Sequence, residues 1–279
     1  MSLLDLGADF FSPLQAESDR GTSSDCPRPQ VSEDASNPRA KFSYREISTM
    51  ALAGAEGRGT RRVEFAREIR ARLRKRVRVL RIKRVFDLVG ATAGLVLTFP
   101  ILFVIALAIL MDSRGPVVFT QLRHGRGGRP FAIYKFRTMY SDLSDLAGLV
   151  QAVRNDPRVT PVGRILRRTN LDELPQLWNV FLGDMSLIGP RPHPIGMKAG
   201  SRVYKELVPT YEYRHFVRPG ITGLAQARGF RGPTVDEVAA RMRIVCDLAY
   251  IYDYSFFWDL KIFMQTLIDW LVRRRLSGG

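Results

Sequence analysis

Cysteine and histidine are both scarce in this chain of 279 residues. Its two cysteines, Cys26 and Cys246, lie far apart in the sequence, so neither a disulfide framework nor a cysteine-based zinc site is expected. The three histidines do not have the i, i+3 or i, i+4 spacing that zinc hydrolases use; they are His124, His193 and His215. The shortage of both residue types predicts that any metal ion is held by oxygen atoms.

Acidic residues are also few relative to basic ones: 27 against 43, which gives a net charge of +16. The excess is concentrated in residues 61–84, where twelve residues are basic and two are acidic. Residues 1–60 are instead mildly acidic and rich in small and polar residues without a sustained apolar period, which predicts a disordered N-terminal tail. A strongly basic segment indicates an anionic partner such as a membrane surface, a nucleic acid or a phosphorylated substrate.

The segment 61–84 has the pattern of a basic amphipathic helix. Its apolar residues recur every three or four positions and so share one helical face: Phe65, Ile69, Leu73, Val77 and Leu80. Such a helix can lie on anionic lipid, bind nucleic-acid phosphates or fill the groove of a partner protein. The segment alone does not decide between these uses, and the apolar run after it favours the membrane.

That run, residues 88–111, contains 24 residues without a charge. About 20 apolar residues are enough to cross the hydrocarbon core of a bilayer, so this run is predicted to lie in a membrane. Pro100 should bend or break the helix near its centre, because proline removes an amide donor and clashes with the preceding turn. Both flanks are basic, whereas a spanning helix carries its Lys/Arg excess on the cytoplasmic side. We therefore expect a re-entrant helix hairpin over residues 85–112, with both ends in the cytosol; a straight helix with a tolerated proline is the alternative.

The remainder, residues 113–279, has the pattern of a small cytosolic domain. Two β-rich runs, 117–122 and 131–136, surround a turn rich in glycine and arginine and predict a β-hairpin. Most other segments have helical periods, and the last helix has aromatic residues and an arginine-rich end that favour the membrane interface over docking on the core. The expected fold class is α/β, mostly α and membrane-associated, with a re-entrant membrane helix hairpin, a small cytosolic catalytic domain and amphipathic interfacial helices.

Arginines in this domain are frequent next to glycine and proline. Guanidinium groups bind phosphate through paired hydrogen bonds, and glycine lets backbone amides come close to it, so a phosphorylated ligand is indicated. For any single arginine, a solvated basic surface is the alternative.

Two adjacent carboxylates, Asp172 and Glu173, stand out because they lie just after the basic segment RILRRT. A phosphate that approaches them would need the nearby arginines and a divalent cation to offset repulsion. The alternative is helix capping: Asn170 and Glu173 have the spacing of a capping box, and Asp172 would suit the positive end of the helix dipole. These residues alone leave both explanations open.

Four blocks of the chain, within residues 83–272, carry a distinctive pattern: KRVFD, GPVVFTQLRHGRGGRPFAIYKFRTM, DPRVTPVGRILRRTNLDELPQLWNVFLGDMSLIGPRP and RPGITGLAQARGFRG. Together they resemble the bacterial sugar transferase family, the monotopic polyprenyl-phosphate phosphoglycosyl transferases. The resemblance implies transfer of a sugar 1-phosphate from a UDP-sugar to undecaprenyl phosphate, with release of UMP, at the cytoplasmic face of the bacterial inner membrane. The segment that begins at GPRPHPIG is most similar to members that transfer glucose 1-phosphate to initiate exopolysaccharide repeat units; galactose and N-acetylhexosamine are the alternatives.

The resemblance also implies roles for individual residues. Asp172 would attack the β-phosphorus of the donor and form a covalent phosphosugar-aspartyl intermediate, and Glu173 would help to hold Mg²⁺. Basic positions that match contacts to the donor's phosphates and nucleotide are Lys135, Arg137, Arg164, Arg167 and Arg191. Positions that match the membrane helix, where basic side chains can reach lipid head groups, are Lys83, Arg84, Asp87 and Pro100. Asn170 departs from the serine expected before LDELPQ and leaves the carboxylate pair intact.

Two other classes of function fit parts of the pattern. A membrane-anchored nucleic-acid-binding protein would use residues 61–84, and a non-catalytic scaffold would recruit polysaccharide enzymes through the N-terminal tail. The expected partners are the UDP-sugar donor, undecaprenyl phosphate and the membrane, and not a nucleic acid; a homodimer is left open.

Overall fold

The computed structural model describes residues 46–49, 59–143, 155–200, 202–230 and 237–276, most of which are helical. Its longer helices are α3 (Gly59–Lys75), α4 (Val77–Asp112), α5 (Pro161–Thr169), α6 (Gln176–Leu182), α9 (Glu237–Tyr252) and α10 (Phe256–Leu276). Its strands are β1 (Val118–His124), β2 (Pro130–Phe136), β3 (Ser186–Ile188), β4 (Lys198–Ala199), β5 (Arg202–Val203) and β6 (Gly220–Thr222). The shorter helices are η1 (Arg126–Gly128), η2 (Leu171–Glu173), α7 (Tyr204–Leu207), η3 (Tyr211–Phe216) and α8 (Leu224–Ala227). Nearly all of the predicted N-terminal tail, residues 1–60, lies outside the described residues.

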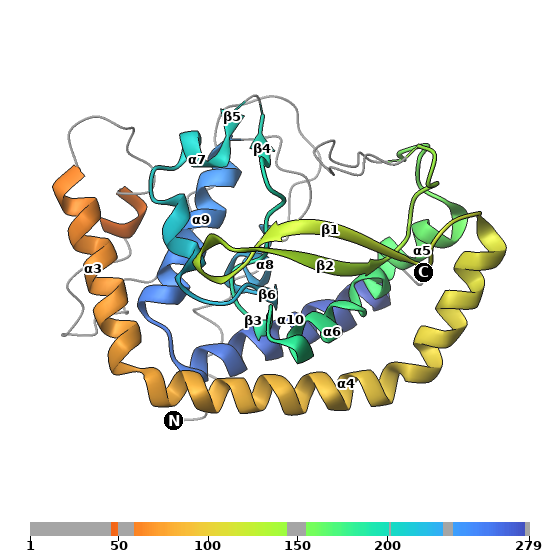
Figure 1. The fold of residues 1–279 in the computed structure, drawn as a ribbon, viewed down its shortest axis with the longest axis horizontal. Helices are drawn as coiled ribbons and strands as arrows, with labels where there is room; N and C mark the ends of the chain where they lie inside the picture. Colours follow the sequence, from red (N-terminus) through yellow and green to blue (C-terminus); the bar gives the residue numbers. More distant parts are fainter. Residues whose placement is uncertain (1–45, 50–58, 144–154, 201, 231–236, 277–279) are drawn as a thin grey trace. The chain divides into compact units, whose positions relative to one another are not determined.

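The basic segment is divided between α3 and α4, which meet at Arg76 (Figure 1). The guanidinium of Arg76 donates to the backbone carbonyl of Tyr252, at the end of α9, at 3.5 Å. On α3, Phe65 and Ile69 are fully buried, and the Phe65 ring stacks on Tyr252 with 5.7 Å between centroids. The first part of the predicted apolar face therefore packs against the domain and does not face lipid, nucleic acid or a partner's groove.

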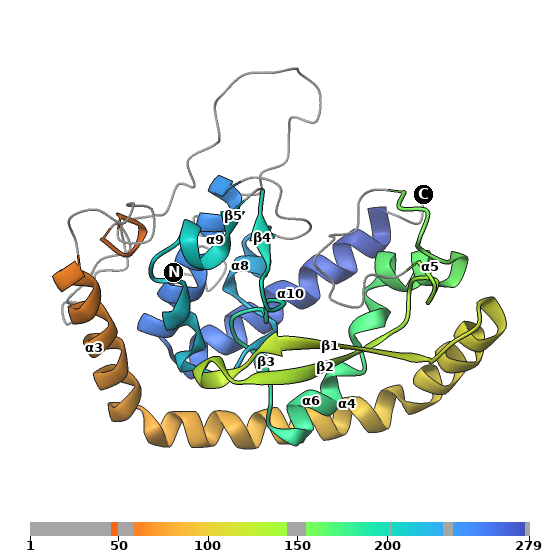
Figure 2. The same cartoon turned by 45° about the horizontal axis from the view of Figure 1, so that its top comes forward.

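Helix α4 is continuous over 36 residues, with Pro100 inside it. Proline leaves one carbonyl of the preceding turn without its amide donor, and the Thr98 hydroxyl donates to the Gly94 carbonyl at 2.6 Å, which also favours bending. Figures 1 and 2 both show α4 curving in its second half, drawn in yellow. The expected bend is thus present, but the structure has one curved helix where the sequence suggested a hairpin of two.

Both ends of α4 attach to the same domain. Near its start, the Asp87 carboxylate accepts a hydrogen bond of 3.0 Å from the hydroxyl of Ser186 on β3. Near its end, Ile109 is buried, and the Asp112 carboxylate accepts a bond of 3.3 Å from the backbone amide of Val162 on α5. The helix is therefore held to the domain at two places on either side of its bend.

Most apolar side chains of α4 remain on the outside of the structure. Leu97 is 77% exposed and Met111 is 88% exposed. Phe86 packs on Phe256, at the start of α10, with 4.7 Å between ring centroids, and the neighbouring Phe257 is exposed. Within the described part of the chain, α4 is the one helix long and apolar enough to cross a membrane. An apolar surface of this size agrees with the predicted membrane association.

The predicted β-hairpin is confirmed as β1 and β2, which pair antiparallel from Val118 opposite Phe136 onward. Gly127 and Gly128 in its turn have φ of 70° and 76°, a left-handed conformation that glycine adopts without strain. The other strands form two short pairs: β3 with β6 in parallel, and β4 with β5 antiparallel.

Gly220 on β6 is required by a close approach of two backbones. A Cβ atom there would lie 2.1 Å from the backbone nitrogen of Gly189, just after β3. The Gly220 amide also donates to the Pro190 carbonyl at 2.9 Å. These contacts fix the start of the loop that carries Arg191.

Candidate active site

The turn between α5 and η2 brings the two adjacent carboxylates to the hairpin. Asn170 ends α5 in a left-handed conformation with φ of 57°, which small polar residues tolerate better than most, and the chain reverses there into η2. The Asn170 side chain makes no capping hydrogen bond, and the Glu173 carboxylate contacts basic residues of other elements. The capping-box explanation is therefore wrong, and the Glu173 side chain serves a tertiary contact.

Glu173 is bound by two cations. Its Oε1 accepts a hydrogen bond of 2.7 Å from Lys135 Nζ on β2 and another from Arg191 Nη2, and its Oε2 accepts from Arg191 Nη1 at 3.2 Å. Burial alone would raise the pKa of Glu173, but Arg191 and Lys135 outweigh it and hold that pKa well below its usual range. Glu173 is therefore a permanent carboxylate at neutral pH.

The carboxylate of Asp172, unlike that of Glu173, is not bound by basic side chains in the described part of the chain. Among the described residues, no hydrogen bond or ion pair reaches its carboxylate, although Lys135 is close enough to influence it. Burial raises the pKa of Asp172, while the charge of Lys135 acts in the opposite direction. The result is a carboxylate without a hydrogen-bond partner beside a cluster of positive charge, which is an arrangement suited to nucleophilic attack on a phosphorus atom.

Asn179 of α6 fixes the hairpin against the segment that carries the carboxylates. Its Oδ1 accepts from the backbone amide of Tyr134 at 2.9 Å, and its Nδ2 donates to the carbonyl of Ala132 at 2.7 Å. The side chain thus continues the hydrogen bonding of β2. Since Lys135 comes directly after Tyr134, this contact sets where Lys135 meets Glu173.

The other predicted phosphate contacts lie in different places. Arg167 is on α5, where its Nε donates to the Thr138 hydroxyl at 2.8 Å; burial lowers its pKa and the charge of Asp172 raises it, so it lies within electrostatic reach of that carboxylate. Arg164 is exposed on the same helix. Arg137 is buried, and its two Nη atoms donate to backbone carbonyls at the end of α4, including that of Ser113 at 2.6 Å. Arg137 therefore satisfies carbonyls that a helix end leaves unpaired and makes no contact with the carboxylate pair.

The residues predicted to meet lipid head groups hold the start of α4 to the domain. Lys83 Nζ lies 2.8 Å from Asp259 Oδ2 on α10, and Arg84 Nη1 donates to the Val180 carbonyl of α6 at 2.7 Å. Asp87 is buried against β3, and Pro100 is exposed on the curved part of α4. Contact with head groups stays a prediction for these positions, because their visible partners are protein atoms.

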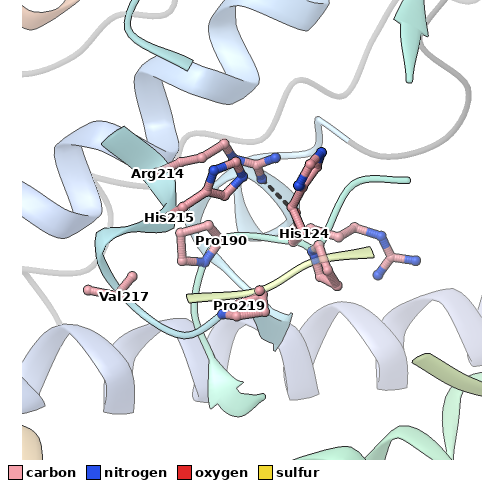
Figure 3. A pocket seen from close by; sticks show the side chains of 9 residues that line it. His124, Pro190, Arg214, His215, Val217 and Pro219 are labelled. Atoms are coloured by element: carbon pink, nitrogen blue, oxygen red, sulfur yellow. Dashed lines mark hydrogen bonds between the residues drawn. The ribbon is translucent and has the colours of Figure 1, made fainter. Parts of the chain in front are cut away.

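Two arginines outside the predicted set support Arg191. Arg123 Nη1 donates to the Pro192 carbonyl at 2.9 Å, and burial, with the charge of Arg191, lowers its pKa to about 9. Arg214 Nη2 donates to the Arg191 carbonyl at 2.5 Å, and its Nε donates to Asp247 Oδ2 at 3.0 Å. Figure 3 shows Arg214 beside His215 and Pro190. Arg123 belongs to the glycine- and arginine-rich turn and had a sequence signal; Arg214 stands alone and had none.

The described residues contain no cluster of three or more His, Cys, Asp or Glu side chains that could hold a metal. Asp172 and Glu173 supply two adjacent carboxylates, which is what Mg²⁺ takes from a protein when substrate phosphates and water complete its coordination. The donor set therefore fits an ion that arrives with a phosphorylated substrate.

Comparison with known proteins adds to this geometry. A family model described as bacterial sugar transferase matches residues 78–273. The exopolysaccharide production protein PSS of Rhizobium leguminosarum bv. phaseoli is 51% identical over 192 residues, which cover 69% of this chain and 96% of that protein. The undecaprenyl-phosphate glucose phosphotransferase of Komagataeibacter xylinus is 49% identical over 185 residues, 66% of this chain and 35% of that protein. The UDP-glucose:undecaprenyl-phosphate glucose-1-phosphate transferase of Escherichia coli K12 is 46% identical over 193 residues, 69% of this chain and 41% of that protein. The chain thus spans nearly the whole Rhizobium protein and less than half of the other two.

Proposed function

Because the chain belongs to the bacterial sugar transferase family, we propose that it transfers a sugar 1-phosphate from a UDP-sugar to undecaprenyl phosphate and so initiates exopolysaccharide assembly. The observation that carries this proposal is a difference between two adjacent carboxylates. Glu173 is bound by two cations, while Asp172 has no hydrogen-bond or ion-pair partner among the described residues. The names of the relatives support the reaction class.

Asp172 is the nucleophile in the mechanism that we propose. One of its carboxylate oxygens attacks the β-phosphorus of the donor, and the bond from that phosphorus to the bridging oxygen breaks, so that UMP leaves with the electron pair. The product is a phosphosugar-aspartyl ester. A phosphate oxygen of undecaprenyl phosphate then attacks the same phosphorus and releases the Asp172 carboxylate, which divides one displacement between anions into two steps.

Positive side chains around Asp172 stabilise the charge that develops on the phosphoryl oxygens. Lys135 and Arg191 are held in place by Glu173, and Arg167 approaches from α5. Mg²⁺, when bound by Glu173 and the diphosphate of the donor, would neutralise further negative charge. Glu173 thus holds Lys135 and Arg191 in place, and in this proposal it would also be a protein ligand of Mg²⁺.

The re-entrant topology of α4 is part of this proposal. A helix that crosses a bilayer places its ends on opposite sides, whereas both ends of α4 contact one domain, at Ser186 and at Val162. A domain on one side of the membrane can satisfy both contacts only if the helix enters and leaves by the same face. In this proposal that face is the cytoplasmic face of the bacterial inner membrane, which the basic flanks of the apolar run favour.

We propose glucose 1-phosphate as the transferred group, because the names of two relatives specify glucose. The test is UMP release by the full chain in nanodiscs with Mg²⁺ and undecaprenyl phosphate, given UDP-glucose, UDP-galactose or UDP-N-acetylhexosamines in turn. UMP that depends on the lipid and is fastest with UDP-glucose is expected. Release that is fastest with another donor would replace the sugar, and no lipid-dependent UMP from any donor would overturn the reaction.

A further inference from the structure

A cavity of about 370 Å³ lies between α3, the start of α4, η1 and η3. Its lining includes none of the residues that form or contact the carboxylate pair. Figures 1 and 2 show the turn between β1 and β2 pointing toward α3. One wall comes from α3 and the first residue of α4, which precede the region that matches the family model. The cavity is therefore separate from the candidate active site and is formed in part by residues that precede the matched region.

Four arginines line this cavity: Arg70, Arg74, Arg126 and Arg218. None of them forms an ion pair with a carboxylate among the residues that the structure describes. Arg218 donates from Nε to the Gly183 carbonyl at 2.8 Å, which leaves its two Nη groups available. Arg70 lies over the Phe216 ring, 4.8 Å from the centroid, so that its planar group is oriented by an aromatic face.

The carboxylates near the cavity are already matched by other partners. Asp87 accepts from Ser186 and from the Leu187 amide, and Asp259 binds Lys83 and accepts from the Tyr250 hydroxyl at 2.7 Å. The four arginines therefore have no carboxylate as a direct ion-pair partner among the described residues. Burial lowers the pKa of Arg218, and the charges of Arg84 and Arg126 lower it further, while the charges of Asp87 and Asp184 raise it.

The wall formed by α3 and the start of α4 also carries aliphatic side chains. Leu73, Val77 and Leu80 continue the face whose earlier members, Phe65 and Ile69, are buried against the domain. Because the domain covers only the first part of this face, its second part is left to line the cavity. A ligand that fills the space would therefore meet aliphatic side chains next to guanidinium groups on this wall, and Arg126 and Arg218 from other elements of the lining.

We propose that this cavity binds a phosphate-bearing ligand with an apolar portion, through Arg70 and Arg74 of α3 together with Arg126 and Arg218. Guanidinium groups bind phosphate oxygens with paired hydrogen bonds, and the aliphatic side chains receive the apolar portion. The ligand is a second one beside the acceptor, whose phosphate must reach Asp172. A phospholipid head group and a free phosphorylated compound share this chemistry, and the experiment separates them.

The test measures binding to the full chain in detergent micelles by the rise in melting temperature. The probes are dihexanoyl-phosphatidic acid, dihexanoyl-phosphatidylcholine and inorganic phosphate. The test variant is R70Q/R74Q, and the matched control is R67Q/R78Q, which removes the same charge from two exposed arginines of the same basic segment that do not line the cavity. If the double variant does not fold, R126Q on the hairpin turn replaces it.

Saturable binding of phosphatidic acid that weakens roughly tenfold or more in R70Q/R74Q, and is unchanged in R67Q/R78Q, is expected. Tighter binding of phosphatidic acid than of inorganic phosphate supports a lipid source; equal binding of the two would show that only the phosphate is recognised and would overturn the ligand with an apolar portion. An equal loss in both double variants would show only general attraction to a basic helix and would overturn the site. A KM for undecaprenyl phosphate that rises tenfold in R70Q/R74Q would assign the cavity to the acceptor and overturn it as a second site.

Discussion

Arg214 donates a hydrogen bond of 2.5 Å from Nη2 to the backbone carbonyl of Arg191, the residue whose side chain binds Glu173. Arg214 and its partner Asp247 are both almost fully buried. Arg214 therefore fixes the backbone of Arg191 relative to α9, although the Arg214 side chain itself makes no contact with the carboxylates of the site. The loop that carries Arg191 depends on this buried pair as well as on the backbone contacts of Gly220.

Replacing Asp247 with asparagine should destabilise the protein by about 3–5 kcal/mol, because it leaves Arg214 buried without a counter-charge. The milder Arg214→Lys keeps the positive charge but loses the planar guanidinium that reaches both Asp247 and the Arg191 carbonyl. It should therefore lower the rate of UMP release while changing the melting temperature little. Melting temperature and the rate of UMP release measure the two effects. R202K, at an exposed arginine, is the control, and equal turnover in R202K and R214K would remove the positioning role.

Asp172→Asn should reduce UMP release by roughly a thousandfold or more, as loss of a covalent nucleophile does in other enzymes. Its melting temperature should stay at or slightly above that of the wild type, because the substitution removes a partly buried charge that has no described partner. D142N, at an exposed aspartate, is the control for a carboxylate outside the site. Turnover within tenfold of wild type in D172N would exclude Asp172 as the nucleophile.

Glu173→Gln, unlike Asp172→Asn, should lower the stability of the protein. It leaves Lys135 and Arg191 close together without their shared anion, which should cost about 3 kcal/mol. The low pKa of Glu173 means that its contribution is present above the unfolded value of about 4.3 and is lost as the pH falls below that value. Thermal unfolding of E173Q, D172N and the exposed-site control E206Q would test this, and a melting temperature for E173Q equal to that of D172N would contradict it.

His215 should make the protein less stable in mild acid. Burial, followed by the charge of Arg214, lowers the pKa of His215 to about 4, and its Nε2 is buried without a hydrogen-bond partner. In the unfolded chain the value is about 6.5, so the contribution of neutral His215 is complete above that pH and is lost as the pH falls toward 4. The melting temperature should fall over this interval, and less steeply in H215Q. Identical slopes for the two proteins would show that His215 does not carry the effect.

Gly163 should not tolerate alanine. A Cβ there would lie 2.1 Å from the backbone carbonyl oxygen of Thr138, so α5 would have to move, at a cost of about 1–3 kcal/mol. Gly90 is the matched case, because its nearest neighbour is the end of the flexible Leu187 side chain, at 2.7 Å. Thermal unfolding should show a larger loss for G163A than for G90A; the reverse order would mean that the α5 contact yields easily.

The sequence predicts the elements that depend on local pattern. The hairpin is indicated by two β-rich runs around glycines, and the long apolar helix by its lack of charge. The adjacency of Asp172 and Glu173 leaves helix capping open, and their proposed roles come from the family resemblance. Which basic side chains bind protein groups, and which remain available to a ligand, was not predictable in this way. Arg137, Arg84 and Lys83 look like phosphate ligands in sequence, yet a backbone carbonyl or a buried carboxylate satisfies the same donors. Only the tertiary arrangement shows which basic side chains have protein partners.

The same holds for α3. Its stripe of apolar residues predicts an amphipathic helix, but periodicity does not reveal which surface the stripe meets. Phe65 and Ile69 are buried against the domain, while Leu73 and Val77 line a cavity. The first part of this continuous apolar face therefore packs against the domain and its second part lines the cavity, because the domain surface ends between them.

The two attachments of α4, at Asp87 and at Asp112, also fix how long the helix between them can be. Each inserted residue would turn one end by about 100° relative to the other and lengthen the helix by about 1.5 Å. An insertion or deletion would therefore misalign one of the two attachments, even where the new residue is as apolar as its neighbours. Substitutions along the exposed face change only composition, whereas the number of residues in the helix is set by the domain that it joins.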